Sequence, residues 1–182
     1  MKTDIKKFWE NFYQEHLGIT VDFSTLQIPP IPDGKILLII HKGLTIKKLI
    51  RAIKKHFNVC FSDHDLITDE ALIHDRTTET TYLVVINNSA ESDEDLKNLS
   101  ISELNEKGVK GITLIELLIL KLLFFGKSQA LDTECVTLCS GSHLPKGEMP
   151  CAFSDSGDFD ISLDPGLPSN VLRARAISYC SL

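Results

Sequence analysis

The apolar segment 112–125 constrains the fold more than any other part of the sequence. Thr113 and Glu116 stand at its start with the spacing of a helix capping box. The segment is apolar nearly all round, as expected of a helix in the centre of a core. It contains Glu116 and Lys121, and it is shorter than the roughly 20 apolar residues that span a bilayer. The sequence therefore predicts a buried central helix and no membrane partner.

An amphipathic helix is predicted over residues 5–17. Its apolar side chains recur at helical spacing, and Gly18 follows the last of them as a stop signal. The next segment, 20–34, contains Pro29, Pro30 and Pro32, and proline disfavours both helix and central strand because it lacks an amide donor. We expect this segment to be an extended surface connector.

A β-α-β unit is predicted over residues 35–61. Residues 35–41 form a continuous apolar run of strand length, which is typical of a strand buried on both faces. A helix over 46–57 follows, with Thr45 as its N-cap, and residues 58–61 have the composition of a short strand. The length and order of these elements match a β-α-β unit.

Short alternating segments dominate the sequence after residue 128. Clusters of Ser, Gly, Pro and Asp separate them, which is the pattern of short antiparallel strands. The sequence thus predicts the α+β class, with a mixed sheet, helices around the buried central helix, and a C-terminal region of short antiparallel strands. We expect residues 1–128 to form an α/β portion, including the N-terminal helix. Residues 129–182 should form a β-rich region that packs on it as one globular unit.

Charge and cysteine content limit the classes of function. The formal net charge of −6 argues against binding nucleic acid or anionic lipid through the overall electric field. The five cysteines are odd in number and lack paired spacing, so they do not indicate a disulfide framework. No apolar stretch of a secretory signal follows the first residues. We expect a soluble, cytoplasmic protein and predict no cofactor.

The order and spacing of several blocks resemble a family of uncharacterised bacterial proteins. The similarity covers most of the chain from about residue 44, and it implies a bacterial origin but no activity, cofactor or partner. The sequence departs from the family pattern at Cys135, where Trp or Asn is frequent, and near Lys146 and Gly147, where a Gly usually follows an Asp. The blocks that carry the resemblance are residues 91–100, 111–116, 137–142 and 172–176.

The cysteines of the C-terminal region are candidate metal ligands. Cys135, Cys139, His143 and Cys151 are ligand types that zinc accepts, but zinc knuckles pair cysteines on tight turns. Cys135 and Cys139 instead flank a strand-like segment, where cysteines usually act as small core hydrophobes. Cys139 and His143 would also suit a nucleophile and its base, but no nucleophile elbow accompanies them. We favour the core role and assign no catalytic or metal-binding residue.

The predicted helix 46–57 is the main candidate for nucleic-acid binding. Clustered cations release counterions from a phosphate backbone even when the whole protein is acidic. However, surface helices often carry lysine, an acidic loop follows, and no aromatic residues are interleaved. Nucleic acid is therefore a possible but not a favoured partner. The cations are Lys47, Lys48, Arg51, Lys54 and Lys55.

A polar surface of the C-terminal region is the favoured candidate binding site. Arg173 and Arg175 alternate with apolar residues, so both should project from one face of a strand, where they would bind an anion or pair with Asp158, Asp160 or Asp164. We prefer the pairing. The aspartates lack the spacing of a calcium-binding loop, so a solvated strand face explains them better than calcium. The candidate ligand-binding residues are Ser142, His143, Asp158, Asp160, Arg173 and Arg175.

The sequence contains no assembled catalytic constellation, which favours a non-enzymatic binding or interaction protein with a C-terminal polar recognition surface. Its partner would be a protein or a small ligand. The alternative is a nucleic-acid-binding protein that uses helix 46–57, and a cysteine- or metal-dependent enzyme is the third hypothesis.

Overall fold

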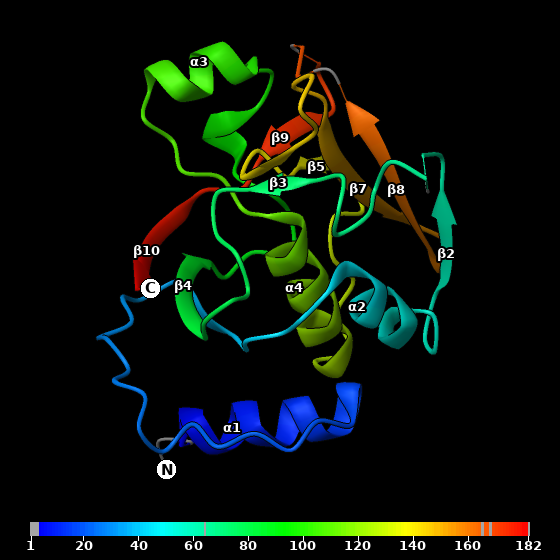
Figure 1. The fold of residues 1–182 in the computed structure, drawn as a ribbon. Helices are drawn as coiled ribbons and strands as arrows, with labels where there is room; N and C mark the ends of the chain where they lie inside the picture. The colour runs from blue at the N-terminus through cyan, green and yellow to red at the C-terminus, as the bar shows by residue number, and fades with distance from the viewer. Residues whose placement is uncertain (1–3, 64, 165, 168, 182) are drawn as a thin grey trace.

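The computed structural model describes residues 4–63, 65–164, 166–167 and 169–181 of the chain. It has the predicted α+β class, with helices, a mixed five-stranded sheet and two smaller antiparallel sheets (Figure 1). The helical elements are α1 Ile5–Phe12, η1 Tyr13–Leu17, α2 Ile46–Ile53, η2 Glu94–Leu96, α3 Ile101–Glu106 and α4 Leu114–Gly126. The strands are β1 Lys35–Ile40, β2 Asn58–Phe61, β3 Ile73–His74, β4 Tyr82–Asn87, β5 Val136–Leu138, β6 Ser142–His143, β7 Met149–Asp155, β8 Asp158–Asp164, β9 Leu172–Ala174 and β10 Ile177–Ser181.

The apolar segment forms α4, which lies in the middle of the molecule with α1 across one end and α2 beside it (Figure 1). The predicted capping box is confirmed. Thr113 accepts from the amide of Glu116, and the Glu116 carboxylate accepts from the amide of Thr113. Every residue from Leu114 to Phe124 is buried, including Glu116 and Lys121. Among the described residues, no helix has the length and apolar character needed to cross a membrane.

The first helix also agrees with the prediction, although its last turn is wider than an α-helix. Asp4 caps α1, and the chain continues as the π-type turn η1 to Gly18, which adopts the left-handed conformation (φ 67°). The wider turn buries Tyr13, whose hydroxyl donates to the carbonyl of Ile39 at 2.7 Å and accepts from the amide of His41 at 2.9 Å. These two bonds fix the N-terminal segment against the end of β1.

The predicted β-α-β unit is wrong. β1 pairs antiparallel with β4, and β4 pairs on its other side with β10. β2 belongs to the five-stranded sheet, where it pairs parallel with β8. The reason is burial: Tyr82 to Ile86 in β4 are all buried and can lie beside the buried β1, whereas the short β2 is only half-buried and fits an edge.

The mixed sheet has the strand order β2-β8-β7-β5-β9. β7 and β8 form an antiparallel hairpin, whereas β9 is parallel to β5, so the C-terminal strands are not all antiparallel as predicted. β3 pairs with β6 in a small antiparallel sheet. In each of the three sheets, strands from before residue 129 pair with strands from after it. The two predicted portions therefore interleave.

Candidate functional site

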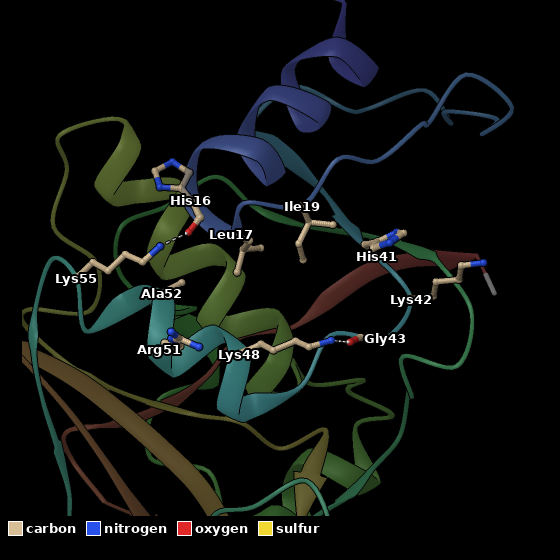
Figure 2. Close-up of a pocket in the computed structure, with 10 residues that line it drawn as sticks. All are labelled: His16, Leu17, Ile19, His41, Lys42, Gly43, Lys48, Arg51, Ala52 and Lys55. Atoms are coloured by element: carbon tan, nitrogen blue, oxygen red, sulfur yellow. Dashed lines mark hydrogen bonds between the residues drawn. The ribbon is translucent and has the colours of Figure 1, made fainter.

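A basic pocket of about 570 Å³ lies between η1, the end of β1 and α2 (Figure 2). Four cationic residues line it, Lys42, Lys48, Arg51 and Lys55, and none of its described lining residues is acidic. The other lining residues are His16, Leu17, Ile19, His41, Gly43 and Ala52. We use the name basic pocket for this set of residues.

The amphipathic pattern of α2 places its cations in the pocket. Its apolar residues face the core, where α2 packs on α4, and the remaining circumference is exposed. Lys48 and Arg51 in α2 and Lys55 in the turn that continues it recur at intervals of three and four residues, so they share one side of this segment. Figure 2 shows them along the edge of α2 that faces the N-terminal segment. The sequence predicted this helix and its cations but not the pocket.

The N-terminus of α2 is closed to ligands by the protein itself. Thr45 accepts from the amide of Lys48 at 3.2 Å, and Asp69 accepts from the amide of Ile46 at 2.7 Å. These bonds satisfy amides that would otherwise attract an anion. An anion in the basic pocket would therefore be bound by side chains and not by the helix terminus.

Two of the cations are held by backbone carbonyls. The Lys48 ammonium donates to the carbonyl of Gly43 at 2.8 Å, and the Lys55 ammonium reaches the carbonyl of His16 at 3.5 Å (Figure 2). Arg51 is exposed, and its guanidinium has no hydrogen bond or ion pair within the part of the chain that the structure describes. A planar guanidinium with free donors is the side chain best suited to a bidentate bond with phosphate.

His41 closes the pocket at the end of β1. Its ring packs against the rings of Tyr13 and Phe23. Burial, together with the neighbouring charges of Lys42 and Lys48, holds the pKa of His41 below the ordinary histidine value. The ring is therefore neutral at pH 7, and the positive charge of the pocket comes from the lysines and Arg51.

The pocket residues outside the helix were missed by the sequence prediction. His41, Lys42 and Gly43 follow β1, and the turn through Gly43 (φ 73°) brings them beside α2. The sequence did contain one signal for these residues: a cation, Lys42, stands just after a buried strand and before the helix cap Thr45. His16, Leu17 and Ile19 join the pocket only because η1 packs on α2, and no local pattern indicates this contact.

The two arginines of the predicted C-terminal surface do pair with acids, but not with the predicted aspartates. Arg173 forms an ion pair with Glu94. Arg175 is fully buried and donates to Asp132 at 2.9 Å and to the carbonyl of Ser89. Burial raises the pKa of Asp132 to about 6, although the charge of Arg175 acts in the opposite direction. Arg175 therefore serves an internal network and is not on the surface.

The other predicted ligand-binding residues lie in two strands of different sheets, β6 and β8. Ser142 in β6 is buried, and its hydroxyl lies 2.7 Å from Nδ1 of His74 and accepts from the amide of Leu114. His143 is half-buried, with Nδ1 2.9 Å from the carbonyl of Leu144. Asp158 and Asp160 are half-buried on β8, where Asp158 accepts from the side chain of Asn58. Within the described residues, no hydrogen bond or ion pair joins Ser142 or His143 to Asp158 or Asp160.

The predicted cysteine candidates also separate. Ligand atoms of Glu91, Asp132 and Cys135 lie within 4.8 Å of one another, and this described cluster does not include Cys139, His143 or Cys151. The Cys135 thiol donates to Glu91 at 3.1 Å, so the carboxylate already has a partner. Burial raises the pKa of the Cys139 thiol, which disfavours the reactive thiolate. Cys139 and Cys151 are buried, as expected for core residues.

The chain matches no protein-family model, no curated protein and no solved structure. The candidate site therefore rests on its own geometry and charge, and the resemblance to a bacterial family stays a prediction.

Proposed function

We propose that this protein is a binding protein for phosphate-bearing ligands, which it holds in the basic pocket. The observation that carries the proposal is the lining: four cationic residues line one hollow, and no carboxylate is among its described lining residues. Like charges that face one space repel one another, and a bound anion relieves that repulsion. A pocket of about 570 Å³ has the size of a small-molecule site.

The geometry also assigns roles to three of the four cations and to His41. Lys48 and Lys55 are held by carbonyls of the pocket wall, so little side-chain entropy is lost when they bind an anion. Arg51 supplies unpaired donors for two phosphate oxygens. The neutral ring of His41 supports a phosphate at pH 7 by hydrogen bonding and not by charge.

Reversing two charges of the pocket should abolish most of the phosphate binding. We expect the double variant Lys48→Glu/Arg51→Glu to weaken pyrophosphate binding by at least about tenfold, because each charge-assisted hydrogen bond contributes about 1.5–3 kcal/mol. Isothermal titration calorimetry at low ionic strength measures this change. Both side chains are exposed, so the variant should keep the fold of the parent protein.

The matched control is Lys107→Glu/Lys110→Glu, which makes the same change in net charge at two exposed lysines outside the pocket. We expect this control to bind pyrophosphate as the parent does. Equal weakening in both double variants would show that the overall charge alone determines binding, and it would contradict the proposal. Absence of pyrophosphate binding to the parent protein would contradict it as well.

Nucleic-acid binding is the second candidate function. The observation that favours it is that the cations of α2 continue beyond the basic pocket to Lys47 and Lys54, which are also exposed. We expect Lys47→Glu/Lys48→Glu/Lys54→Glu to abolish low-salt retention of single-stranded DNA or RNA on a column. Retention that is unchanged in this triple variant, or that does not fall with added salt, contradicts this candidate. A C-terminal recognition surface and a cysteine- or metal-dependent activity stay predictions.

A further inference from the structure

A second hollow of about 610 Å³ lies on the other side of α2. Its apolar lining consists of Ile46, Ile50, Phe61 and Ile67, from α2, β2 and the loop after β2. Lys47 and Lys54 stand on its α2 side, and Thr68 and Glu70 stand on its loop side. We call this space the apolar hollow.

Arg51 lines both the basic pocket and the apolar hollow. Residues 47, 50 and 54 form the side of α2 that faces the hollow, and residues 48, 52 and 55 form the side that faces the pocket. Position 51 lies between these two sides on a helical wheel. A ligand whose phosphate binds Arg51 from the basic pocket can therefore extend over the helix into the apolar hollow.

The hollow suits a flat, partly polar ring. Nucleobases stack on aromatic rings and on guanidinium planes, and Phe61 and Arg51 supply these two groups. Exocyclic amino groups need a hydrogen-bond acceptor at the ring edge. Glu70 supplies one, because it is exposed and its carboxylate has no hydrogen bond or ion pair among the described residues. Asp69 is not available, because its carboxylate accepts from the first amides of α2.

We propose that the protein binds nucleoside 5′-phosphates that carry an amino-substituted base, with the phosphate in the basic pocket and the base in the apolar hollow. This inference rests on the proposed function, because the basic pocket has to hold the phosphate. It adds a subsite for the base and names the ligand class.

The test compares three probes on the parent protein: inorganic phosphate, ribose 5-phosphate and adenosine 5′-monophosphate. We expect the last to bind at least about tenfold more tightly than ribose 5-phosphate, because the buried base adds apolar contact and a hydrogen bond. Calorimetry measures the three affinities. In nuclear magnetic resonance spectra, the adenosine nucleotide should shift the amide signals of Phe61 and Ile67, and ribose 5-phosphate should not.

The variant Glu70→Ala should weaken the binding of adenosine 5′-monophosphate about three- to tenfold and leave the binding of ribose 5-phosphate unchanged. Its matched control is Glu79→Ala, another exposed glutamate that lines neither space and should have no effect. Equal affinity for the two probes, or equal effects of the two variants, overturns the base subsite. If binding of both probes still depends on Lys48 and Arg51 in that case, the proposed phosphate-binding function stands. Absence of binding by all three probes overturns both.

Discussion

Replacing Glu116 by alanine should lower the free energy of unfolding by about 3–5 kcal/mol, because the change removes the carboxylate that neutralises the charge of the buried Arg76. Both oxygens of Glu116 accept from Arg76, at 2.7 and 2.8 Å, and one of them also accepts from the amide of Thr113. Glu116 is fully buried and Arg76 nearly so. Urea unfolding followed by circular dichroism measures the loss.

Glu103 provides the matched control. It forms the same kind of capping box with Ser100 at the start of α3, but it lies in solvent. Water can replace its bonds, so Glu103→Ala should cost far less than Glu116→Ala. The double variant Arg76→Met/Glu116→Leu should recover much of the lost stability, since apolar pairs often replace buried ion pairs. Equal losses of unfolding free energy in Glu103→Ala and Glu116→Ala would contradict the argument that burial makes the Glu116 bonds costly to lose.

The contribution of Lys121 to the stability of the protein should rise as the pH increases from 7 to 9.5. This lysine is 2% exposed, lies over the rings of Phe57 and Phe159, and donates to Ser154. Burial lowers its pKa from 10.5 to about 8, although the charge of Asp132 acts in the opposite direction. Between these two pKa values the unfolded chain binds more protons than the folded protein, so a higher pH favours folding.

The expected gain between pH 7 and 9.5 is about 2 kcal/mol relative to the variant Lys121→Met, which lacks the titrating group. Unfolding curves of both proteins at a series of pH values measure this difference. The comparison removes the contribution of tyrosines and other groups that titrate in the same range. Parallel pH profiles of the two proteins would show that Lys121 has an ordinary pKa in the folded state.

The sequence predicted those elements that depend on neighbours along the chain. The capping box of α4 joins Thr113 to Glu116 within one turn, and the amphipathic patterns of α1 and α2 repeat within a few turns. Asp158 and Asp160 of β8 also follow the predicted alternation, because they are half-buried whereas Phe159 and Ile161 are buried. The acidic residues Glu94 and Asp95 would suit the first turn of a helix, but only a single 3-10 turn, η2, forms there.

The candidate site could be predicted only in part. Lys47, Lys48, Arg51, Lys54 and Lys55 were identified from the helical pattern of α2, but this pattern describes a convex surface and not a pocket. The wall opposite α2 comes from residues 16–19, which lie more than 25 positions earlier in the chain. The predicted partners of the two C-terminal arginines were wrong for the same reason. The observed partners, Glu94 and Asp132, are remote from the arginines in sequence.

The sequence by itself determined the helices, their caps, most strand positions and the α+β class, because hydrophobic periodicity and capping act over a few residues. Only the tertiary structure decided which strands pair, which charges are buried together and where the basic pocket opens. Those choices depend on contacts between distant segments, and their energies come from burial that no short stretch of sequence contains. The separation of β1 and β2 into different sheets shows this limit directly, since either strand alone has the composition of the predicted unit.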